Sequence, residues 1–282
     1  MYETFYGLRE RPFHVTADVT FLFPSRDHKE AMAHLTYGIQ QRLGFLMITG
    51  EVGTGKTTLA KALIGQLSPP IRTALILNPG LNGVQLLQAV IHDFGFQQDA
   101  SSRLTRGGLM KALEEFLLSL NQSGGNAVLI IDEAQAVSPN TLEMVRLLSN
   151  VETDKTKLIQ IVLIGQPELV QRLSTDRRLR ALNERIAVKY HIRPLSEDEV
   201  TEYIGHRLRV AGAKEYPRFS PEAIALISNA TEGIPRRINH LCDQALLAGF
   251  VQESRVIDEP LVREAQGTNP FHQKEVVNEL NC

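Results

Sequence analysis

The chain has 282 residues, of which 43% are apolar, so it is long enough for two small domains and a sizeable core. Lys and Arg number 30 against 32 Asp and Glu, a balance that excludes a general electrostatic attraction to nucleic acid or anionic lipid. Two widely spaced cysteines, no apolar stretch of membrane-helix length and no signal-peptide pattern predict a cytoplasmic protein without a membrane segment of its own.

Strand-like and helix-like segments alternate from residue 45 to about residue 193. The predicted strands are Phe45–Thr49, Arg72–Leu77, Ala127–Ile131, Leu158–Ile164 and Ile186–Ile192. Apolar spacing or capping signals predict helices at Val84–Phe94, at Leu109–Leu120, after Ser138 and from Pro167. This order predicts a three-layer α/β domain over residues 45–194.

The pattern changes near Pro194. Ser196 and Glu199 form a capping box, and further helices are predicted from Ser220 and from Pro235. Because no comparable strand follows, residues 195–266 are predicted to form an all-helical second domain. Residues 1–44 are expected to pack on the α/β core as an N-terminal segment, and residues 267–282 to form a polar tail.

Residues 50–57 match the phosphate-binding pattern G-x-x-x-x-G-K-[ST] at every fixed position, between an apolar strand and a helix. Glycines let the main-chain N–H groups of such a loop surround an anion. Lys56 is expected to reach the β- and γ-phosphates, and the Thr57 hydroxyl to bind Mg²⁺. The predicted ATP-binding residues are Gly50, Glu51, Val52, Gly53, Thr54, Gly55, Lys56, Thr57, Thr58 and Asn78.

An acidic pair, Asp132 and Glu133, directly follows the third predicted strand. A strand that ends in Asp can place its carboxylate beside a cation held by Thr57, so Thr57 and Asp132 are the predicted Mg²⁺ ligands. Glu133 can then polarise a water for attack on the γ-phosphate. The alternative is an ordinary acidic pair at the start of a helix.

Two polar residues flank later strands. Gln166 follows the fourth strand; if that strand lies between the first and the third, its amide can bind the γ-phosphate or the attacking water. Helix capping before Pro167 is the alternative. Arg185 precedes the fifth strand and is a candidate arginine finger for a neighbouring subunit's site. Its competitors are Arg177, Arg178 and Arg180, or a solvated basic face without a catalytic role.

Arg236 lies in the first turn of a predicted helix of the second domain. A cation there opposes the helix dipole, which indicates an anionic partner such as the γ-phosphate. Arg237 is the runner-up, and a surface arginine is the alternative. Asn78 ends the second strand and is expected either to hydrogen-bond Glu133 and hold it inactive, or simply to form a turn.

With these motifs the chain resembles the AAA+ ATPases, and within them the ExeA/GspA-type secretion ATPases, from about Tyr2 to Ala265. The residues typical of the subclass are Tyr6-Gly7-Leu8, Pro12-Phe13, Phe21-Leu22-Phe23, His28-Lys29-Glu30-Ala31, Tyr37-Gly38-Ile39, Gly50-Glu51-Val52-Gly53, Gly165-Gln166-Pro167-Glu168-Leu169 and Gly233-Ile234-Pro235-Arg236. The resemblance implies a five-stranded parallel sheet of order 5-1-4-3-2, a helical lid, and a homo-oligomeric ring, such as a hexamer, with sites at subunit boundaries.

One feature departs from that family. ExeA-type proteins carry a membrane segment and a peptidoglycan-binding domain after the lid, whereas this sequence stops soon after the lid. Its compact length is similar to the short form associated with mannose-sensitive hemagglutinin pilus biogenesis. The resemblance implies a cytoplasmic protein, peripheral to the inner membrane, that works with pilus or secretion assembly proteins.

Three functions fit these observations. The first is a Mg²⁺-dependent ATPase that drives or gates assembly of a bacterial envelope machine, for type IV pilus biogenesis or type II secretion. The second is a DNA-associated ATPase for transposition or replication loading. The basic stretch from Arg177 to Arg193 favours it, but the net charge of −2 and the lack of a DNA-binding module oppose it. The third is a nucleotide-gated scaffold with slow turnover. The sequence favours the first, and nucleic acid is not an expected partner.

Overall fold

The computed structural model describes residues 1–78, 80–95, 105–154 and 156–267. It divides into two compact units. The α/β unit comprises residues 26–51 and 56–193, and the helical unit comprises residues 1–25, 52–55 and the described residues from Pro194 to Gly267. Of the predicted polar tail, residues 268–282 lie outside the described residues, and Gly267 ends the last helix.

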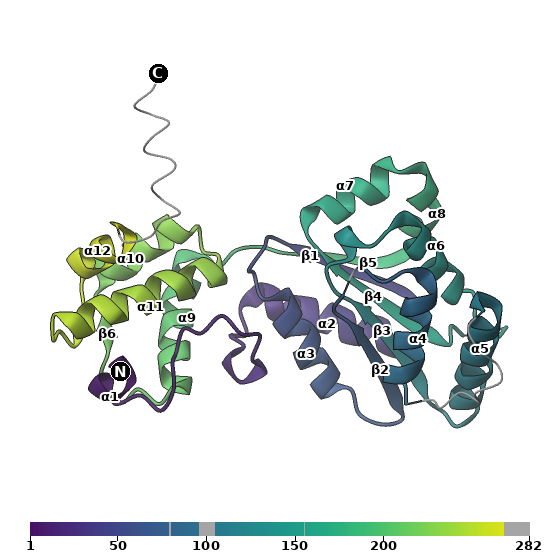
Figure 1. Ribbon diagram of the computed structural model, residues 1–282, viewed down its shortest axis with the longest axis horizontal. Helices are drawn as coiled ribbons and strands as arrows, with labels where there is room; N and C mark the ends of the chain where they lie inside the picture. Colours follow the sequence, from purple (N-terminus) through teal and green to yellow (C-terminus); the bar gives the residue numbers. More distant parts are fainter. Residues whose placement is uncertain (79, 96–104, 155, 268–282) are drawn as a thin grey trace, which may run out of the picture. The chain divides into compact units, whose positions relative to one another are not determined.

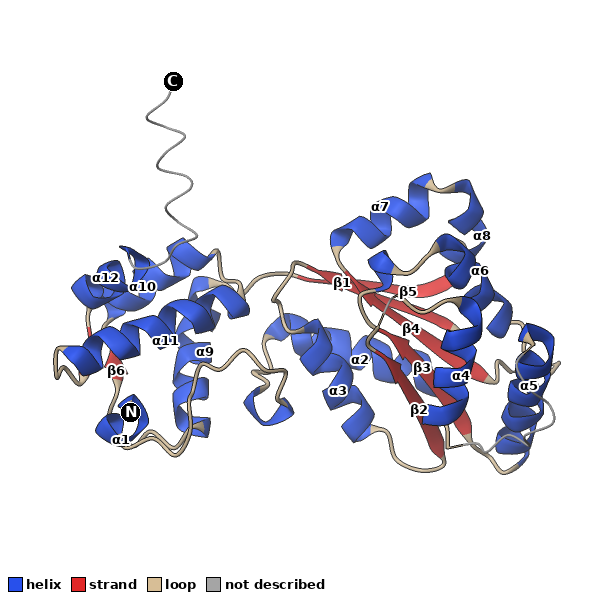
Figure 2. Ribbon diagram, viewed as in Figure 1, coloured by secondary structure: helices blue, strands red, loops and turns tan. Residues whose placement is uncertain are grey.

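Five parallel strands form the sheet of the α/β unit: β1 (Phe45–Gly50), β2 (Ile71–Ile76), β3 (Asn126–Ile131), β4 (Ile159–Gly165) and β5 (Ile186–Ile192). Their order, β2-β3-β4-β1-β5, confirms the predicted order 5-1-4-3-2 (Figures 1 and 2). Because β4 lies between β1 and β3, the residues that follow these three strands meet at the carboxyl edge of the sheet.

One helix, α2 (Arg26–Gln40), precedes the first strand of this unit, and the others lie between strands: α3 (Lys56–Gln66), α4 (Gly83–Asp93), α5 (Arg106–Gln122), α6 (Pro139–Leu148), α7 (Pro167–Thr175) and α8 (Arg180–Asn183). Short 3₁₀ turns lie at Ala134–Ala136 (η2) and Arg177–Leu179 (η3). The predicted cap of α6 is present, since Ser138 Oγ accepts a hydrogen bond from Thr141 N at 3.1 Å. Helix α4 begins with a capping box made by Asn82 and Gln85.

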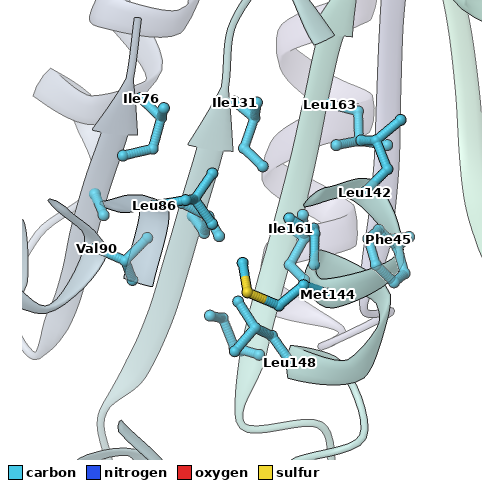
Figure 3. Close-up of a cluster of buried hydrophobic side chains, with 14 of the residues drawn as sticks. Phe45, Ile76, Leu86, Val90, Ile131, Leu142, Met144, Leu148, Ile161 and Leu163 are labelled. Carbon is cyan, nitrogen blue, oxygen red and sulfur yellow. The ribbon is translucent and has the colours of Figure 1, made fainter. Parts of the chain in front are cut away.

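Both faces of the sheet are covered by apolar side chains. Alternate strand residues, such as Phe45, Ile131 and Ile161, pack with Leu86 of α4 and Leu142 of α6 on one face (Figure 3). The residues between them pack with α2 and α3 on the other face, in a cluster that includes Leu46, Ile130, Val162, Leu35 and Leu63. Every residue of β1, β3 and β4 is buried, as expected for central strands of a parallel sheet.

The helical unit contains α1 (Tyr2–Tyr6), η1 (Val19–Phe21), α9 (Glu197–Val210), α10 (Pro221–Thr231), α11 (Pro235–Val251) and α12 (Glu259–Gly267). The capping box predicted at Ser196 and Glu199 is present. One detail corrects the all-helical expectation, because β6 (Arg218–Phe219) and β7 (Val256–Ile257) form a short parallel pair. Strands of two residues each are too short to produce a periodic apolar pattern in the sequence.

The N-terminal segment is shared between the two units, which differs from the expectation that residues 1–44 pack together on the α/β core. Residues 26–44 follow that expectation, since α2 contributes Leu35 and Ile39 to the core of the sheet. Residues 1–25 instead group with the helical unit, where Tyr6 and Phe13 join its apolar cluster. Tyr6 Oη also donates a hydrogen bond to Leu246 O of α11 at 3.0 Å. The aromatic side chains of Tyr6 and Phe13 therefore pack residues 1–25 into the helical unit.

The chain passes between the two units at Ser25–Arg26, on either side of residues 52–55, and at Arg193–Pro194. Within the α/β unit, Asp27 and Arg193 are bonded directly to each other. The carboxylate of Asp27 accepts hydrogen bonds from the Arg193 backbone N at 2.7 Å, from Nε at 3.1 Å and from Nη2 at 2.8 Å. The bonds from Arg193 lower the pKa of Asp27. The first and the last of these crossings are thus joined by hydrogen bonds on the α/β unit.

Candidate nucleotide site

The loop that follows β1 has the geometry its sequence predicts. β1 ends at Gly50 and α3 begins at Lys56. Between them Gly53 and Gly55 have φ values of 88° and 93°, a region that glycine adopts without strain. The side chain of Thr54 is buried, with 1% exposure. A strand that turns sharply into a helix N-terminus in this way presents main-chain N–H groups to an anion.

Lys56 is held against this loop. Its residue exposure is only 5%, and its Nζ donates hydrogen bonds to the carbonyls of Gly50 and Glu51, both at 2.8 Å. A buried ammonium is stabilised by such partners, and phosphate oxygens are acceptors of the same kind with more negative charge. The arrangement therefore suits a lysine that binds phosphates from within the loop.

Thr57 and Asp132 are brought together although 75 residues separate them in the sequence. Thr57 Oγ1 donates to Asp132 Oδ2 at 2.5 Å. Asp132 follows β3 and is 3% exposed, and its backbone N donates to Ile76 O at 2.9 Å, which continues the sheet by one residue. The strand order β3-β4-β1 accounts for this meeting of the two motifs.

The oxygen atoms of Thr57 and Asp132 fit a magnesium ion. Mg²⁺ prefers hard oxygen ligands and is usually held by one or two protein groups together with water and substrate phosphates. A hydroxyl and a carboxylate 2.5 Å apart at the mouth of a phosphate loop supply that partial set. No cluster of three or more His, Cys, Asp or Glu in the described part of the chain forms a separate metal site.

Glu133 lies beside Asp132 in a left-handed backbone conformation, with φ 51° and ψ 38°. Its backbone N donates to Asp132 Oδ1 at 2.9 Å. Its carboxylate Oε2 accepts from Gln166 Nε2 at 3.0 Å and from Gln135 Nε2 at 2.5 Å. The structure thus brings Glu133 and Gln166 together as predicted from the position of β4. Sequence reasoning missed Gln135, and its signal was its place two residues after Glu133.

Asn78 does not contact Glu133. It is exposed, and its Oδ1 accepts from Gly80 N at 3.0 Å, so the turn alternative describes its hydrogen bonding. The amides that hold Glu133 come instead from Gln135 and Gln166. Gln135 lies in η2, two residues after Glu133, whereas the Asn78 oxygen is bonded within its own turn.

Arg185 lies away from these groups. It immediately precedes β5, and Ile186 at the start of β5 pairs with Phe45 at the start of β1. In a parallel sheet this places Arg185 at the amino edge, opposite the edge that carries Lys56 and Asp132. Its Nη1 donates to Asn150 Oδ1 at 2.5 Å and to Ser149 Oγ at 3.2 Å.

Arg236 belongs to the helical unit together with residues 52–55. It is exposed in the first turn of α11, and its backbone N donates to Gly53 O at 3.2 Å. A Cβ added at Gly53 would lie 2.6 Å from the Arg236 Cβ, so glycine permits this close approach. The runner-up, Arg237, is occupied by an ion pair with Glu232.

Known proteins are similar to this chain over much of its length. A family model described as an AAA domain matches residues 39–173. The chain is 44% identical to general secretion pathway protein A of Aeromonas hydrophila over 257 residues, which make up 91% of this chain and 46% of that protein. An uncharacterised HTH-type transcriptional regulator of Methanocaldococcus jannaschii is 28% identical over 62% of this chain and 43% of its own length. The chain thus spans less than half the length of these curated relatives.

Solved structures show the same fold at low identity. The ORC2 protein of Aeropyrum pernix, in its ADPNP-ADP complexes, has a TM-score of 0.64 at 18% identity, over 87% of this chain and 68% of that one. The RuvB Holliday junction branch migration motor of Thermotoga maritima has a TM-score of 0.57 at 18% identity, over 88% and 70%. No helix among residues 1–78, 80–95, 105–154 and 156–267 is long and apolar enough to cross a membrane.

Proposed function

We propose a function from the premise that this chain is an AAA domain protein homologous to general secretion pathway protein A. An AAA domain implies binding of ATP and Mg²⁺ in general, and hydrolysis is inferred from the family. Our finer proposal is that the chain hydrolyses ATP at the carboxyl edge of its sheet. The hydrogen bond from Thr57 to Asp132 carries this proposal, because it joins the phosphate loop to the acidic pair.

The roles follow from the contacts around the loop. Mg²⁺ supplies charge neutralisation on the phosphates, and Thr57 and Asp132 are its proposed protein ligands. Lys56 exchanges its two main-chain carbonyls for phosphate oxygens when a triphosphate is bound. Glu133 orients a water and accepts its proton, and Gln166 lies within reach of the same water or of the γ-phosphate. The proposed reaction is in-line attack of that water on the γ-phosphorus, which breaks the bond to the bridging oxygen and releases ADP and inorganic phosphate.

Arg236 is the proposed phosphate contact from the helical unit. Its backbone is bonded to Gly53 of the phosphate loop, and its guanidinium has no ion-pair partner among the described residues. A cation in the first turn of α11 opposes the helix dipole, so an anionic ligand would offset that cost.

Arg185 is the proposed arginine finger, acting on a neighbouring subunit. Its position at the amino edge of β5 keeps it from the phosphate loop of its own chain, which supports action in trans. A head-to-tail contact between identical subunits is the geometry that supplies one chain's arginine to the next chain's nucleotide, and it closes into a ring. We therefore propose a homo-oligomeric ring, with a hexamer as the working assumption.

The proposed task is to drive or gate assembly of a bacterial envelope machine for type II secretion or type IV pilus biogenesis. The 44% identity to general secretion pathway protein A supports the secretion assignment. Since the chain covers only 46% of that relative, its partners stay part of the proposal. The partners we propose are assembly proteins at the cytoplasmic face of the inner membrane.

The first prediction separates binding from hydrolysis. Lys56→Ala is expected to lose ATP binding, because the loop loses its only buried ammonium, and to reduce turnover by at least about 100-fold. Glu133→Gln is expected to bind ATP with unchanged affinity and to lose turnover by about 100- to 10,000-fold, since the general base is gone. Binding of a fluorescent ATP analogue and release of inorganic phosphate measure the two effects.

Glu168→Gln is the matched control for Glu133→Gln, because Glu168 is an exposed carboxylate of α7. It is expected to leave both binding and hydrolysis unchanged. A parental chain that binds no ATP in the presence of Mg²⁺ would refute the proposed function. Hydrolysis by Glu133→Gln at the parental rate would refute the assignment of the base alone.

A further inference from the structure

Gln135 joins three parts of the candidate site. Its Nε2 donates to Glu133 Oε2 at 2.5 Å, and its Oε1 accepts from the backbone N of Gln166 at 3.1 Å. Its own backbone carbonyl accepts from Arg172 Nη1 of α7 at 2.5 Å. The amide of Gln135 therefore connects the turn after β3 to the end of β4, and its main-chain carbonyl connects that turn to α7.

These contacts determine the orientation of the amide. A backbone N–H can only donate, so the atom of Gln135 that faces Gln166 N must be the carbonyl oxygen. The NH₂ group is then the one that faces Glu133, where a carboxylate can only accept. Turning the amide over would lose both hydrogen bonds at once. Gln135 consequently offers Glu133 a donor in a fixed direction.

The backbone at the end of β4 leaves room for this side chain. A Cβ added at Gly165 would lie 2.9 Å from Gln135 Oε1 and 2.9 Å from Leu169 Cδ2. Glycine at this position lets the Gln135 amide reach the N–H of the next residue, Gln166. The two glutamines and Arg172 thus form one hydrogen-bonded arrangement around Glu133, and Gly165 leaves the space for it.

The two amides that hold Glu133 differ in how firmly they are anchored. The Gln135 amide oxygen accepts a hydrogen bond from the main-chain N of Gln166, and the Gln135 main-chain carbonyl accepts one from Arg172. The Gln166 amide has Glu133 as its hydrogen-bond partner among the described residues. If Gln166 turns its amide toward a phosphate, Gln135 still holds the carboxylate, so the direction of Glu133 does not depend on Gln166.

We propose that Gln135 is a positioning residue that orients the Glu133 carboxylate toward the attacking water. The amide of Gln166 can then turn toward the γ-phosphate without changing that orientation. This inference rests on the proposed function, because it names what holds the base of that same reaction. Gln135 touches neither substrate nor reacting atoms in this scheme and acts through Glu133 alone. A misdirected base slows the chemical step but leaves the phosphate loop, and so nucleotide affinity, unchanged.

The test is Gln135→Met, which keeps the length of the side chain and removes the amide. We expect kcat to fall by about 10- to 100-fold, while the Kd values for ATP and ADP stay within about twofold of the parental values. Gln135→Glu tests the same point with a nearly identical shape, since it puts a carboxylate in place of the donor, and it is expected to lose kcat equally. Gln171→Met is the matched control on exposed α7 surface and is expected to match the parent.

A second readout checks that Gln135 acts through Glu133. In a single-turnover experiment with radiolabelled ATP, adding Gln135→Met to Glu133→Gln is expected to cause no further loss, because the base it aims is already absent. A full additional 10-fold loss in that background would overturn the proposal, as would parental kcat in both Gln135 variants. Equal weakening of kcat and nucleotide affinity would also overturn it, because that pattern indicates a structural role. A parental chain without ATPase activity would instead refute the proposed function itself.

Discussion

Arg207 of α9 is buried, with 5% exposure, and its guanidinium donates hydrogen bonds to main-chain carbonyls rather than to a carboxylate. Its Nε donates to Pro12 O at 2.5 Å and its Nη2 to His14 O at 2.9 Å. Its guanidinium lies over the ring of Phe21, with the carbon 4.4 Å from the ring centroid. Burial lowers the pKa of Arg207, yet arginine stays charged at any physiological pH. This side chain therefore fastens residues 12–21 to the helical unit.

The second prediction follows from these contacts. Arg207→Met is expected to lower the free energy of unfolding of the helical unit by about 2 to 4 kcal/mol, because two carbonyls lose their donor and Phe21 loses its stacking partner. It should also expose residues 1–25 to protease. Thermal unfolding and limited proteolysis followed by mass spectrometry measure the two effects.

Arg209→Met serves as the control for Arg207→Met. Arg209 lies two residues further along α9 and is exposed. Its replacement should leave both measurements unchanged. Protease resistance of the N-terminal segment in Arg207→Met would show that the aromatic residues alone hold the segment in place.

At the scale of elements, the join between α10 and α11 depends on one glycine. Gly233 follows the left-handed C-cap Glu232 and has a φ of 69°. Its carbonyl accepts from Leu195 N at 2.9 Å, and a Cβ added there would lie 2.0 Å from Leu195 O. Backbone meets backbone at this point, so no side-chain rearrangement can relieve the contact. The start of α9 and the start of α11 are held together here.

The third prediction is that Gly233→Ala destabilises the helical unit by about 3 kcal/mol or more, through the forbidden φ and the clash with Leu195. Chemical denaturation followed by circular dichroism measures it. Gly205→Ala is the matched control, because Gly205 lies inside α9 with nothing within 4 Å of an added Cβ. That change should be neutral or stabilise by about 0.5 to 1 kcal/mol. Equal stability of the two variants would contradict the assigned role of Gly233.

At the scale of the whole molecule, the position of Arg185 makes the proposed assembly testable. The carboxyl edge of the sheet carries Lys56, Asp132 and Glu133, and the amino edge carries Arg185. A chain with this arrangement cannot place its own Arg185 on its own phosphate loop without breaking the sheet. If the arginine acts on ATP, a second copy of the chain has to supply it.

The fourth prediction is a complementation between two inactive variants. Arg185→Ala and Lys56→Ala are each expected to hydrolyse little ATP alone. Mixed 1:1, they should recover activity at about one quarter of the interfaces, where an intact loop meets an intact arginine by random assembly. Phosphate release, measured across a series of mixing ratios at constant total protein, reports the recovery.

Arg180→Ala is the control for Arg185→Ala, because Arg180 is exposed at α8 and paired with Glu184. It is expected to remain active alone. An absence of recovery at every mixing ratio, with both variants shown to assemble, would exclude Arg185 as a finger that acts in trans.

Much of the fold could be predicted from the sequence because its signals are local. The apolar runs at β1, β3 and β4 are buried on both faces, so each stands out without knowledge of its neighbours. Capping residues such as Ser138 and Ser196 mark where a helix starts, and each bonds to a residue only three positions further along the chain. The strand pair β6–β7 and the packing of residues 1–25 left no such signal, since both depend on partners distant in the sequence.

The phosphate loop could be recognised from the amino-acid sequence, because all of its defining residues are contiguous from Gly50 to Thr57. The sequence also marked Asp132 and Glu133, since they end an unmistakably buried strand. Which amides donate hydrogen bonds to Glu133, those of Gln135 and Gln166, became visible in the folded structure alone. Gln135 lies two residues after Glu133 in the sequence, but its contacts depend on β4 lying beside β3, with Gly165 leaving space for its amide oxygen. Hydrogen-bond partners across a sheet depend on strand order and register, and these are properties of the folded chain as a whole.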